Sequence, residues 1–585
     1  MNNSNGTKKR KHTPSETRKL AQASRILKAC DNCRKQKTRC FRSPENPNSC
    51  VRCHALNKSC SFETFNFDPY FTDNNKLDLI YNGINEVLGL LKNTPTMVAT
   101  PISNSSSINS QQQENEKEDS NEFVDDSTQF QSPPSSFITS PFLIISNSVP
   151  ESVPSPIHKL LNPSKYHSEP NDVISLSILS ESDAITLMDE FRRDFGKWIS
   201  LPIYISTKDW IDEIRIKSSL LLTTGCCITI GKTTSSLPVE LSNKLIQDMN
   251  ECILKYSFYH RKDGIIEFLQ AMVLLSTYSI SISSLVLDSE ANLDSWTLSQ
   301  IGLSTFISSS TFGHLKATND DITLTQLRIY NHLCLTHLFY CMISGRMCII
   351  DEIRINQCYG TLSLLNATNF DGRMVAEINM ILITYTFIQL NNNVQDLSEL
   401  DHNLMNVLEE TKLWYQQWEY LFSQPTIQFV ELNYHFCTIL IYYGYEYHKS
   451  KITGRKVEFL SNASLNVLNY ANEFSLIEMF NHAYSLVKEI NNLEDDIGFS
   501  YLSDQIHFCF YFAALCLIKI LYQCTTGKGY SEQLSEKENV MEVVNTLVDK
   551  FSTISRGDSN NAAFKYKSGI EQILQSHFPE YSDSS

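Results

Sequence analysis

Two copies of one cysteine pattern stand near the N-terminus, and thiolates at this spacing are metal ligands. Each copy reads C-x2-C-x6-C, and together they comprise Cys30, Cys33, Cys40, Cys50, Cys53 and Cys60. A C-x2-C pair on a helical turn directs two sulfurs toward one point, which a third cysteine six residues later can also reach. The spacing predicts structural zinc. Because zinc prefers four ligands, two ions on six sulfurs require two bridging sulfurs. A disulfide-linked domain, or one zinc ion with spare thiols, are the alternatives.

Basic charge is concentrated in the same part of the chain. The formal net charge is −16, yet residues 1–60 hold 15 Lys and Arg against 3 Asp and Glu, so the remainder is strongly acidic. A basic segment on an acidic chain predicts phosphate binding at one end only, and therefore a nucleic-acid partner. On a short helix, one side would carry the basic donors that lie between the second and third cysteines: Arg34, Lys35, Lys37 and Arg39.

With C-R-x2-K-x-R-C in its first half, the segment resembles the DNA-binding module of fungal binuclear zinc-cluster (Zn2Cys6) transcription factors. The resemblance implies two Zn²⁺ ions per chain. It also implies that the first cysteine of each half, Cys30 and Cys50, is the bridging ligand.

The resemblance further implies how the module contacts double-stranded DNA. Lys37 matches the lysine that reads the guanines of a CGG triplet in the major groove, where guanine presents the acceptors O6 and N7. Arg34 and Arg39 match positions that contact phosphate. Lys28 and Lys35 are further candidates for DNA contacts. Solvated charges around a zinc site are the alternative for all five.

The segments on either side of the module are polar. Residues 1–25 are expected to form a disordered basic arm, in which a nuclear localisation signal is predicted at Lys8, Lys9, Arg10 and Lys11. The same four charges could instead add phosphate contacts. We place the zinc-cluster domain at 26–62 and a linker at 63–75.

A helix with apolar residues at alternating spacings of three and four is predicted at 76–93. Its seam comprises Leu77, Ile80, Ile84, Val87 and Leu91. These are a and d positions over two heptads, which predict a coiled coil and a homodimer. A helix that packs on its own chain is the alternative.

Residues 94–172 are rich in Ser, Asn, Gln and Pro and have too few apolar residues for a core, so a disordered linker is expected. Acidic residues and phenylalanine mix within 114–126, which is the composition of a weak activation segment or simply of solvated linker. An activation segment would recruit the transcription machinery or its coactivators.

From about residue 173 to 580 the chain turns apolar and aromatic, with helical spacing such as Ile185, Met188, Phe191, Phe195 and Trp198. One large all-α domain, or two fused ones, is expected. Motifs within 180–360 resemble the middle-homology regulatory domain of the same family, including an aromatic helix that ends at Gly345-Arg346-Met347. The longest apolar run, 508–518, is too short to span a bilayer, so we expect a buried helix and no membrane partner.

Two other patterns point to chemistry that we do not expect. Residues 225–233 (GCCITIGKT) approach a phosphate-binding loop, but five residues separate the first glycine from GKT where that loop has four. Cys334, His337 and Cys341 share one helix face, yet lack a fourth ligand, and are expected to be ordinary core residues. No serine, cysteine or paired-carboxylate arrangement indicates an enzyme.

The sequence therefore predicts a nuclear, sequence-specific DNA-binding regulator of transcription, acting on RNA polymerase II genes and containing zinc. The alternative is a metabolite-sensing receptor, in which the helical domain binds a small-molecule effector and DNA binding is the output. The two differ in whether the helical domain contains a cavity large enough for a ligand.

Overall fold

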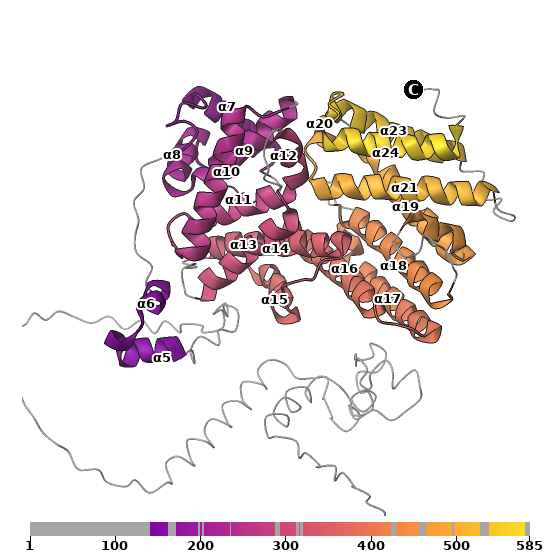
Figure 1. Cartoon of the computed structure of the whole chain (residues 1–585), viewed down its shortest axis with the longest axis horizontal. Helices are drawn as coiled ribbons and strands as arrows, with labels where there is room; N and C mark the ends of the chain where they lie inside the picture. Colours follow the sequence, from indigo (N-terminus) through magenta and orange to yellow (C-terminus); the bar gives the residue numbers. More distant parts are fainter. Residues whose placement is uncertain are drawn as a thin grey trace, which may run out of the picture. The chain divides into compact units, whose positions relative to one another are not determined.

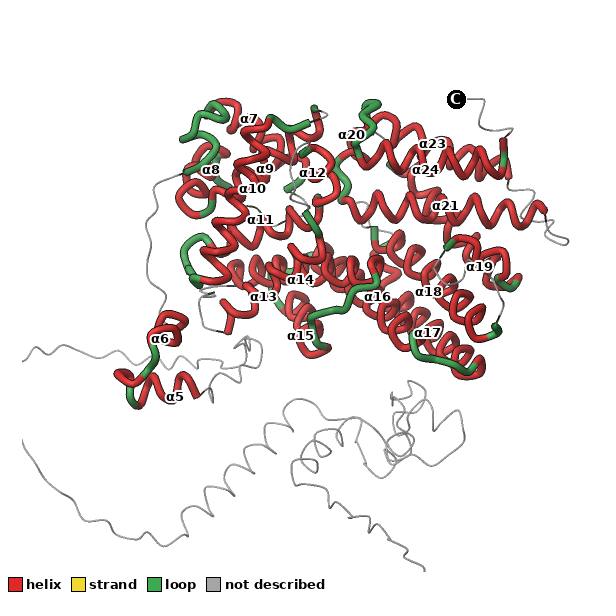
Figure 2. Tube along the Cα trace, in the orientation of Figure 1, coloured by secondary structure: helices red, strands yellow, loops and turns green. Residues whose placement is uncertain are grey.

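The computed structural model describes residues 141–161 and 171–579, with short gaps in the second range, the longest at 455–463 and 527–536. Every regular element among these residues is a helix (Figure 2). The large all-helical domain that the sequence predicts is thus confirmed. The zinc-cluster domain, the basic arm and the predicted coiled coil lie outside the described residues.

Two short helices form within the segment for which no core was expected. They are α5 (Pro141–Ser148) and α6 (Ser155–Leu161), with one turn of 3-10 helix, η3 (Pro150–Ser152), between them. None of their described side chains is buried. They are therefore local structure that adds nothing to a core.

The first half of the domain contains nine helices among the residues that the structure describes (purple to red in Figure 1). Their bounds are α7 Glu181–Asp194, α8 Thr207–Lys217, α9 Ser219–Thr233, α10 Val239–Ile253, α11 Ile265–Thr277, α12 Ser279–Leu285, α13 Ser295–Thr311, α14 Asp320–Ser344 and α15 Glu352–Asn356. A π-helical turn, η4 (Leu254–Phe258), extends α10, and a 3-10 stretch, η5 (Gln357–Ser363), follows α15.

The second half runs from orange to yellow in Figure 1. Its helices are α16 Asn369–Asn391, α17 Leu397–Trp418, α18 Val430–Ile452, α19 Glu473–Lys488, α20 Asp496–Ser500, α21 Asp504–Thr526, α23 Lys537–Ser555 and α24 Ala562–His577, with 3-10 turns η6 Glu419–Leu421, η7 Leu465–Tyr470 and η8 Glu489–Asn492. Helices close in sequence, such as α16 and α18, or α18 and α19, pack against one another.

Buried apolar side chains from both halves form one continuous core that extends from Val173 to Phe578. The stripe predicted on α7 is part of it: Met188, Phe191 and Phe195 are fully buried, whereas Trp198 lies outside the described residues. The sequence also determines where several helices begin, because the side chain of the residue before the helix accepts a hydrogen bond from a backbone N–H of the first turn. The Ser180 hydroxyl, for example, accepts from Asp183 N at 3.1 Å before α7.

The predicted apolar helix at 508–518 is confirmed, but it is longer than its apolar run. Among the described residues, α21 is the one single helix long and apolar enough to cross a membrane. Its most apolar window is 56% buried in the domain, as expected for a core helix. Helices α11 and α12 pass the same test only when they are counted together across a bend of 78°.

Polar contacts tie the two halves together. Arg328 of α14 makes two hydrogen bonds of 2.7 Å to the buried Asp371 carboxylate of α16. Far from that pair, the Lys232 ammonium at the end of α9 donates to the carbonyl oxygen of Ser500, and Arg556 donates to the carbonyl oxygen of Lys232. Residues distant in sequence are thereby brought to one junction of α9, α12, α21, α23 and α24.

Candidate functional site

The zinc ligands, DNA contacts, dimer seam and localisation signal predicted from the sequence all lie before residue 141, outside the described residues. Their positions stay predictions. The described helical domain contains, among other hollows, two more enclosed cavities and a wider, more open hollow of about 680 Å³ beside Gly264 and Asp321. It also contains one cluster of metal-binding side chain types. The enclosed cavities and the cluster bear on whether the domain binds an effector.

The larger of the two more enclosed cavities lies where α9 and α12 meet α21, α23 and α24, and has a volume of about 230 Å³. A cavity of about 150 Å³ is large enough to hold benzene. The space therefore suits a small metabolite. Its charged lining residues are Lys232, Asp504 and Arg556.

Lys232 is one of the charged residues that line this cavity. Its ammonium lies over the rings of Phe195 and Tyr278, at 5.5 and 5.9 Å from their centroids. Burial lowers the pKa of Lys232 to about 8; Asp504 opposes this shift and Arg556 adds to it. The side chain still carries its charge near neutral pH, at a cost that an added anion would relieve.

Asp504, in contrast, is fully engaged by the protein. Its carboxylate accepts from Ile280 N at 2.8 Å, from Ser281 N at 3.1 Å and from the Ser281 hydroxyl, at the start of α12. Burial raises the pKa of Asp504, and these hydrogen bonds oppose the rise. Burial also lowers the pKa of His507, another lining residue, to about 3, so it is neutral. Lys232 and Arg556 bring two positive charges to the lining and Asp504 can supply at most one negative charge, so the lining is net positive.

A smaller cavity, of about 60 Å³, lies between α11, α14, α16, α18 and α21. Three buried polar atoms that line it have no hydrogen-bond partner among the described residues: His332 Nε2, Glu377 Oε1 and Gln505 Nε2. The volume suits a few water molecules, which buried polar groups commonly bind. This cavity is too small for most metabolites, so the larger one is the candidate effector site.

Neither of the two sequence patterns set aside above forms the site that it suggested. Residues 225–233 lie inside the continuous helix α9, so their amides are not free to surround a phosphate. His337 and Cys341 do lie close together, but the third member of their group is Cys348 rather than Cys334.

Sequence reasoning missed the residues of the larger cavity. Lys232 stood inside the pattern that was set aside, and Asp504 and Arg556 lie some 270 residues or more further along the chain. No local spacing could join them.

Comparison with known families covers both ends of the chain. The fungal Zn(2)-Cys(6) binuclear cluster domain matches residues 28–66. The middle domain of the transcriptional activator of proteases prtT matches residues 177–565. The second match extends well beyond residue 360, where the last recognisable motif stood.

Similar proteins are fungal regulators. An uncharacterized transcriptional regulatory protein of Schizosaccharomyces pombe is 24% identical over 90% of this chain and 83% of its own length. The transcriptional activators of proteases prtT of Penicillium rubens and Aspergillus clavatus are each 26% identical, over 73% and 72% of this chain. The chain spans just under two thirds of the length of these two relatives, 64% and 65%. No solved structure matches the chain.

Proposed function

Because the chain belongs to the family defined by the prtT middle domain and is a DNA-binding transcription regulator with a Zn(2)-Cys(6) domain, we propose that it reads CGG-type triplets in the major groove as a homodimer. The domain binds two zinc ions. The observation that carries the proposal is the pair of C-x2-C-x6-C repeats enclosing the basic run at 34–39.

The donor set fits two zinc ions. Six thiolates supply two tetrahedral ions only if two of them bridge, and we assign the bridges to Cys30 and Cys50. The other ligands are Cys33, Cys40, Cys53 and Cys60. The bound metal supplies the folding free energy that so small a domain cannot obtain from an apolar core.

Within this domain, we assign base reading to Lys37 and backbone contacts to other basic residues. A lysine ammonium suits the O6 and N7 acceptors of guanine. The phosphate contacts are Arg34, Arg39, Lys28 and Lys35, and such contacts carry no sequence information.

Three base pairs recur too often in a genome to specify one site, so selective binding would require a dimer that reads two triplets. We assign the dimer interface to the seam of Leu77, Ile80, Ile84, Val87 and Leu91. The test is binding of the full chain to DNA probes that carry one or two CGG triplets. Ile84→Asp should weaken binding to paired triplets far more than to one triplet, whereas Asn82→Asp, off the seam, should change neither. Equal losses for Ile84→Asp on both probes would exclude this seam.

We propose that the regulator acts in the nucleus, imported through Lys8, Lys9, Arg10 and Lys11, and has no enzymatic activity. The boundaries proposed from the sequence, 26–62 for the zinc domain and 76–93 for the dimer helix, define the segments to delete. The names of the prtT relatives make protease genes the first promoters to test for binding of this chain.

A second candidate function is effector binding by the helical domain, and the 230 Å³ cavity beside Lys232 favours it. Its net positive lining points to a small anionic metabolite. A ligand at 100 times its Kd stabilises the folded state by about 2.7 kcal/mol, which thermal unfolding detects. The assay is thermal unfolding of the full chain across a panel of small carboxylates and phosphates.

The matched control for this assay is Lys255. Like Lys232 it is half-buried, donates to a backbone carbonyl (that of Lys217, at 3.3 Å) and lies over a tyrosine ring, at 5.0 Å. Lys232→Met should abolish the stabilisation by the anion, and Lys255→Met should retain it. An anion that stabilises both variants equally binds elsewhere.

A further inference from the structure

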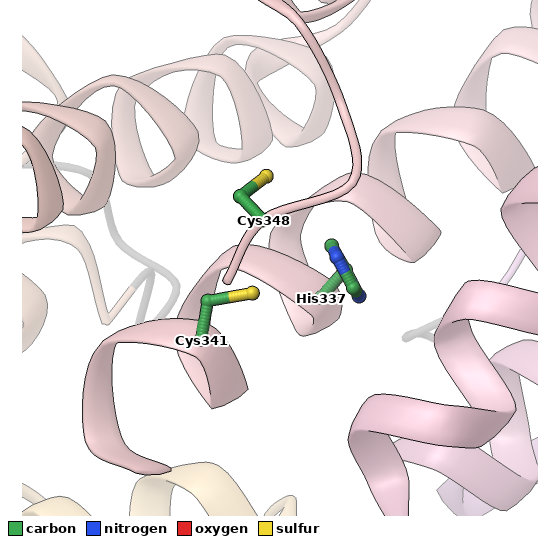
Figure 3. Close-up of side chains that lie close together, drawn as sticks. All are labelled: His337, Cys341 and Cys348. Atoms are coloured by element: carbon green, nitrogen blue, oxygen red, sulfur yellow. The ribbon is translucent and has the colours of Figure 1, made fainter. Parts of the chain in front are cut away.

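The loop that follows α14 brings a third metal-binding side chain type to a pair on the helix. His337 and Cys341 lie one turn apart on α14, and Cys348 lies in the loop after it (Figure 3). One ligand atom from each, a ring nitrogen and two sulfurs, all lie within 4.8 Å of one another. Among the described residues this is the one such group of three.

A reversal of the chain at Gly345 brings Cys348 back beside His337 and Cys341. Helix α14 ends at Ser344, and Gly345 adopts φ +69°, the left-handed conformation that glycine tolerates best after a helix. The following residues can then return along the helix they have just left. Cys348 thus lies opposite Cys341 and His337 although six residues separate the two cysteines.

Side chains from two other segments, the start of α13 and the middle of α16, hold the returning loop in place. The Arg346 guanidinium makes two hydrogen bonds of 2.6 Å to the Asp294 carboxylate and lies 5.0 Å from the Trp296 ring centroid. The Trp296 Nε1–H donates to the Met347 carbonyl at 3.2 Å. The Cys348 N–H donates to the Tyr385 hydroxyl at 2.9 Å. These contacts therefore hold Cys348 in its position in the folded domain.

The histidine is also oriented by its neighbours. The Ile349 backbone N–H, which can only donate, lies 3.3 Å from His337 Nε2, so that nitrogen is the acceptor. The other nitrogen, Nδ1, is 3.2 Å from the Ser299 hydroxyl. A hydrogen bond on the second ring nitrogen is the usual way in which a protein orients a histidine ligand. Nε2 faces the loop, and a zinc ion bound there would take the lone pair that accepts from the Ile349 N–H, so that hydrogen bond would be exchanged for the bond to the metal.

We propose that His337, Cys341 and Cys348 bind a third zinc ion, in addition to the two of the N-terminal cluster. Zinc–sulfur bonds of about 2.3 Å and zinc–nitrogen bonds of about 2.0 Å place the ligand atoms of a tetrahedron about 3.5–3.8 Å apart. Because the three atoms lie within 4.8 Å of one another, they would approach by at most about 1.3 Å on binding zinc. Two thiolates and an imidazole suit zinc. Two thiolates also neutralise the ion, which favours a site where two of the three ligands are buried.

Three protein ligands leave the fourth position of a tetrahedral zinc ion to water or to an exogenous group. Cys348 is half-buried rather than enclosed, so the group lies near the surface of the domain. In the folded domain the ion would join the end of α14 to its returning loop.

The test is the zinc content of the purified full chain, prepared under reducing conditions with zinc present and measured by mass spectrometry of the metal. We expect three zinc ions per chain, and two in Cys348→Ser. The matched control is Cys334→Ala, a buried cysteine on the same helix that does not belong to the group, which should retain three. A Cys30→Ala chain that has lost its cluster should still retain one.

A second measurement keeps the test valid if Cys348→Ser fails to fold. In the unaltered chain, bound zinc should protect Cys348 from alkylation, and a chelator should remove that protection. Two zinc ions in the unaltered chain, or equal alkylation with and without chelator, would overturn the proposal. A disulfide between Cys341 and Cys348 in the reduced preparation would also overturn it.

Discussion

We expect the two ends of this protein to fold by different means. The segment that matches the zinc-cluster family, 28–66, is short, basic and rich in cysteine, so we expect its folding to depend on metal. The helical domain buries a continuous apolar core from Val173 to Phe578. In the first region we expect a few ligands to determine both structure and function, whereas the second rests on many buried side chains. A substitution that unfolds one region should therefore leave the other region folded.

The largest expected effect comes from removing a bridging ligand. Cys30→Ala should abolish site-specific DNA binding and lose both cluster zincs, because we assign this sulfur to both ions. Thermal unfolding of the helical domain should not change. Cys60→Ala, which removes a ligand of one ion only, is the control and should lose less zinc. Equal zinc loss in the two variants would contradict the bridging assignment.

The converse experiment destabilises the helical domain. Asp248 accepts from Lys244 Nζ at 2.7 Å and from the Thr223 hydroxyl at 2.6 Å, and both charged side chains are buried. Asp248→Ala leaves an unpaired buried ammonium and should lower the free energy of unfolding by about 3–5 kcal/mol.

Denaturant unfolding measures this loss. The double variant Asp248→Leu with Lys244→Met, which leaves no buried charge, should recover most of the stability. The folded fraction of the Asp248→Ala chain should still prefer CGG over a scrambled triplet. Loss of that preference would show that the two regions are not independent.

A smaller effect concerns pH. Burial raises the pKa of Glu377 from 4.5 to about 7, although Arg373 opposes the rise. Between these two values the folded protein holds a proton that the unfolded chain has released. Raising the pH through this window therefore lowers the free energy of unfolding, by up to about 3 kcal/mol above pH 7. His332, in the same cavity, is neutral throughout, because burial lowers its pKa to about 3.

Glu377→Gln should remove this pH dependence, since the amide does not titrate. The measurement is unfolding by denaturant at pH 5 and pH 8, where the variant should gain stability relative to the unaltered chain only at pH 8. Glu409→Gln, on an exposed part of α17, is the control. An equal effect of Glu377→Gln at both pH values would show that burial does not raise this pKa.

The two regions also differ in how much of their structure can be predicted from the sequence. Spacing within a few turns predicted the buried stripe of Met188, Phe191 and Phe195, and showed that 225–233 is no phosphate loop. It could not reveal that Lys232 shares a cavity with Asp504, because tertiary packing alone brings them together.

Cys348 illustrates the same limit at shorter range. The helical spacing of Cys334, His337 and Cys341 was visible in the sequence, but the group that forms replaces Cys334 by Cys348. That replacement depends on the reversal at Gly345 and on the contacts that fix the loop. A helical pattern cannot describe a residue that lies beyond the end of its helix.

We propose that the zinc domain of this regulator reads CGG through Lys37, and the affinity of the full chain for a CGG probe relative to a scrambled one tests this. Lys37→Ala should cost about 1–3 kcal/mol on CGG and remove the preference. Arg34→Ala should weaken both probes about equally and reduce the dependence on salt, as loss of a phosphate contact does. An unchanged preference for CGG in Lys37→Ala would contradict the account.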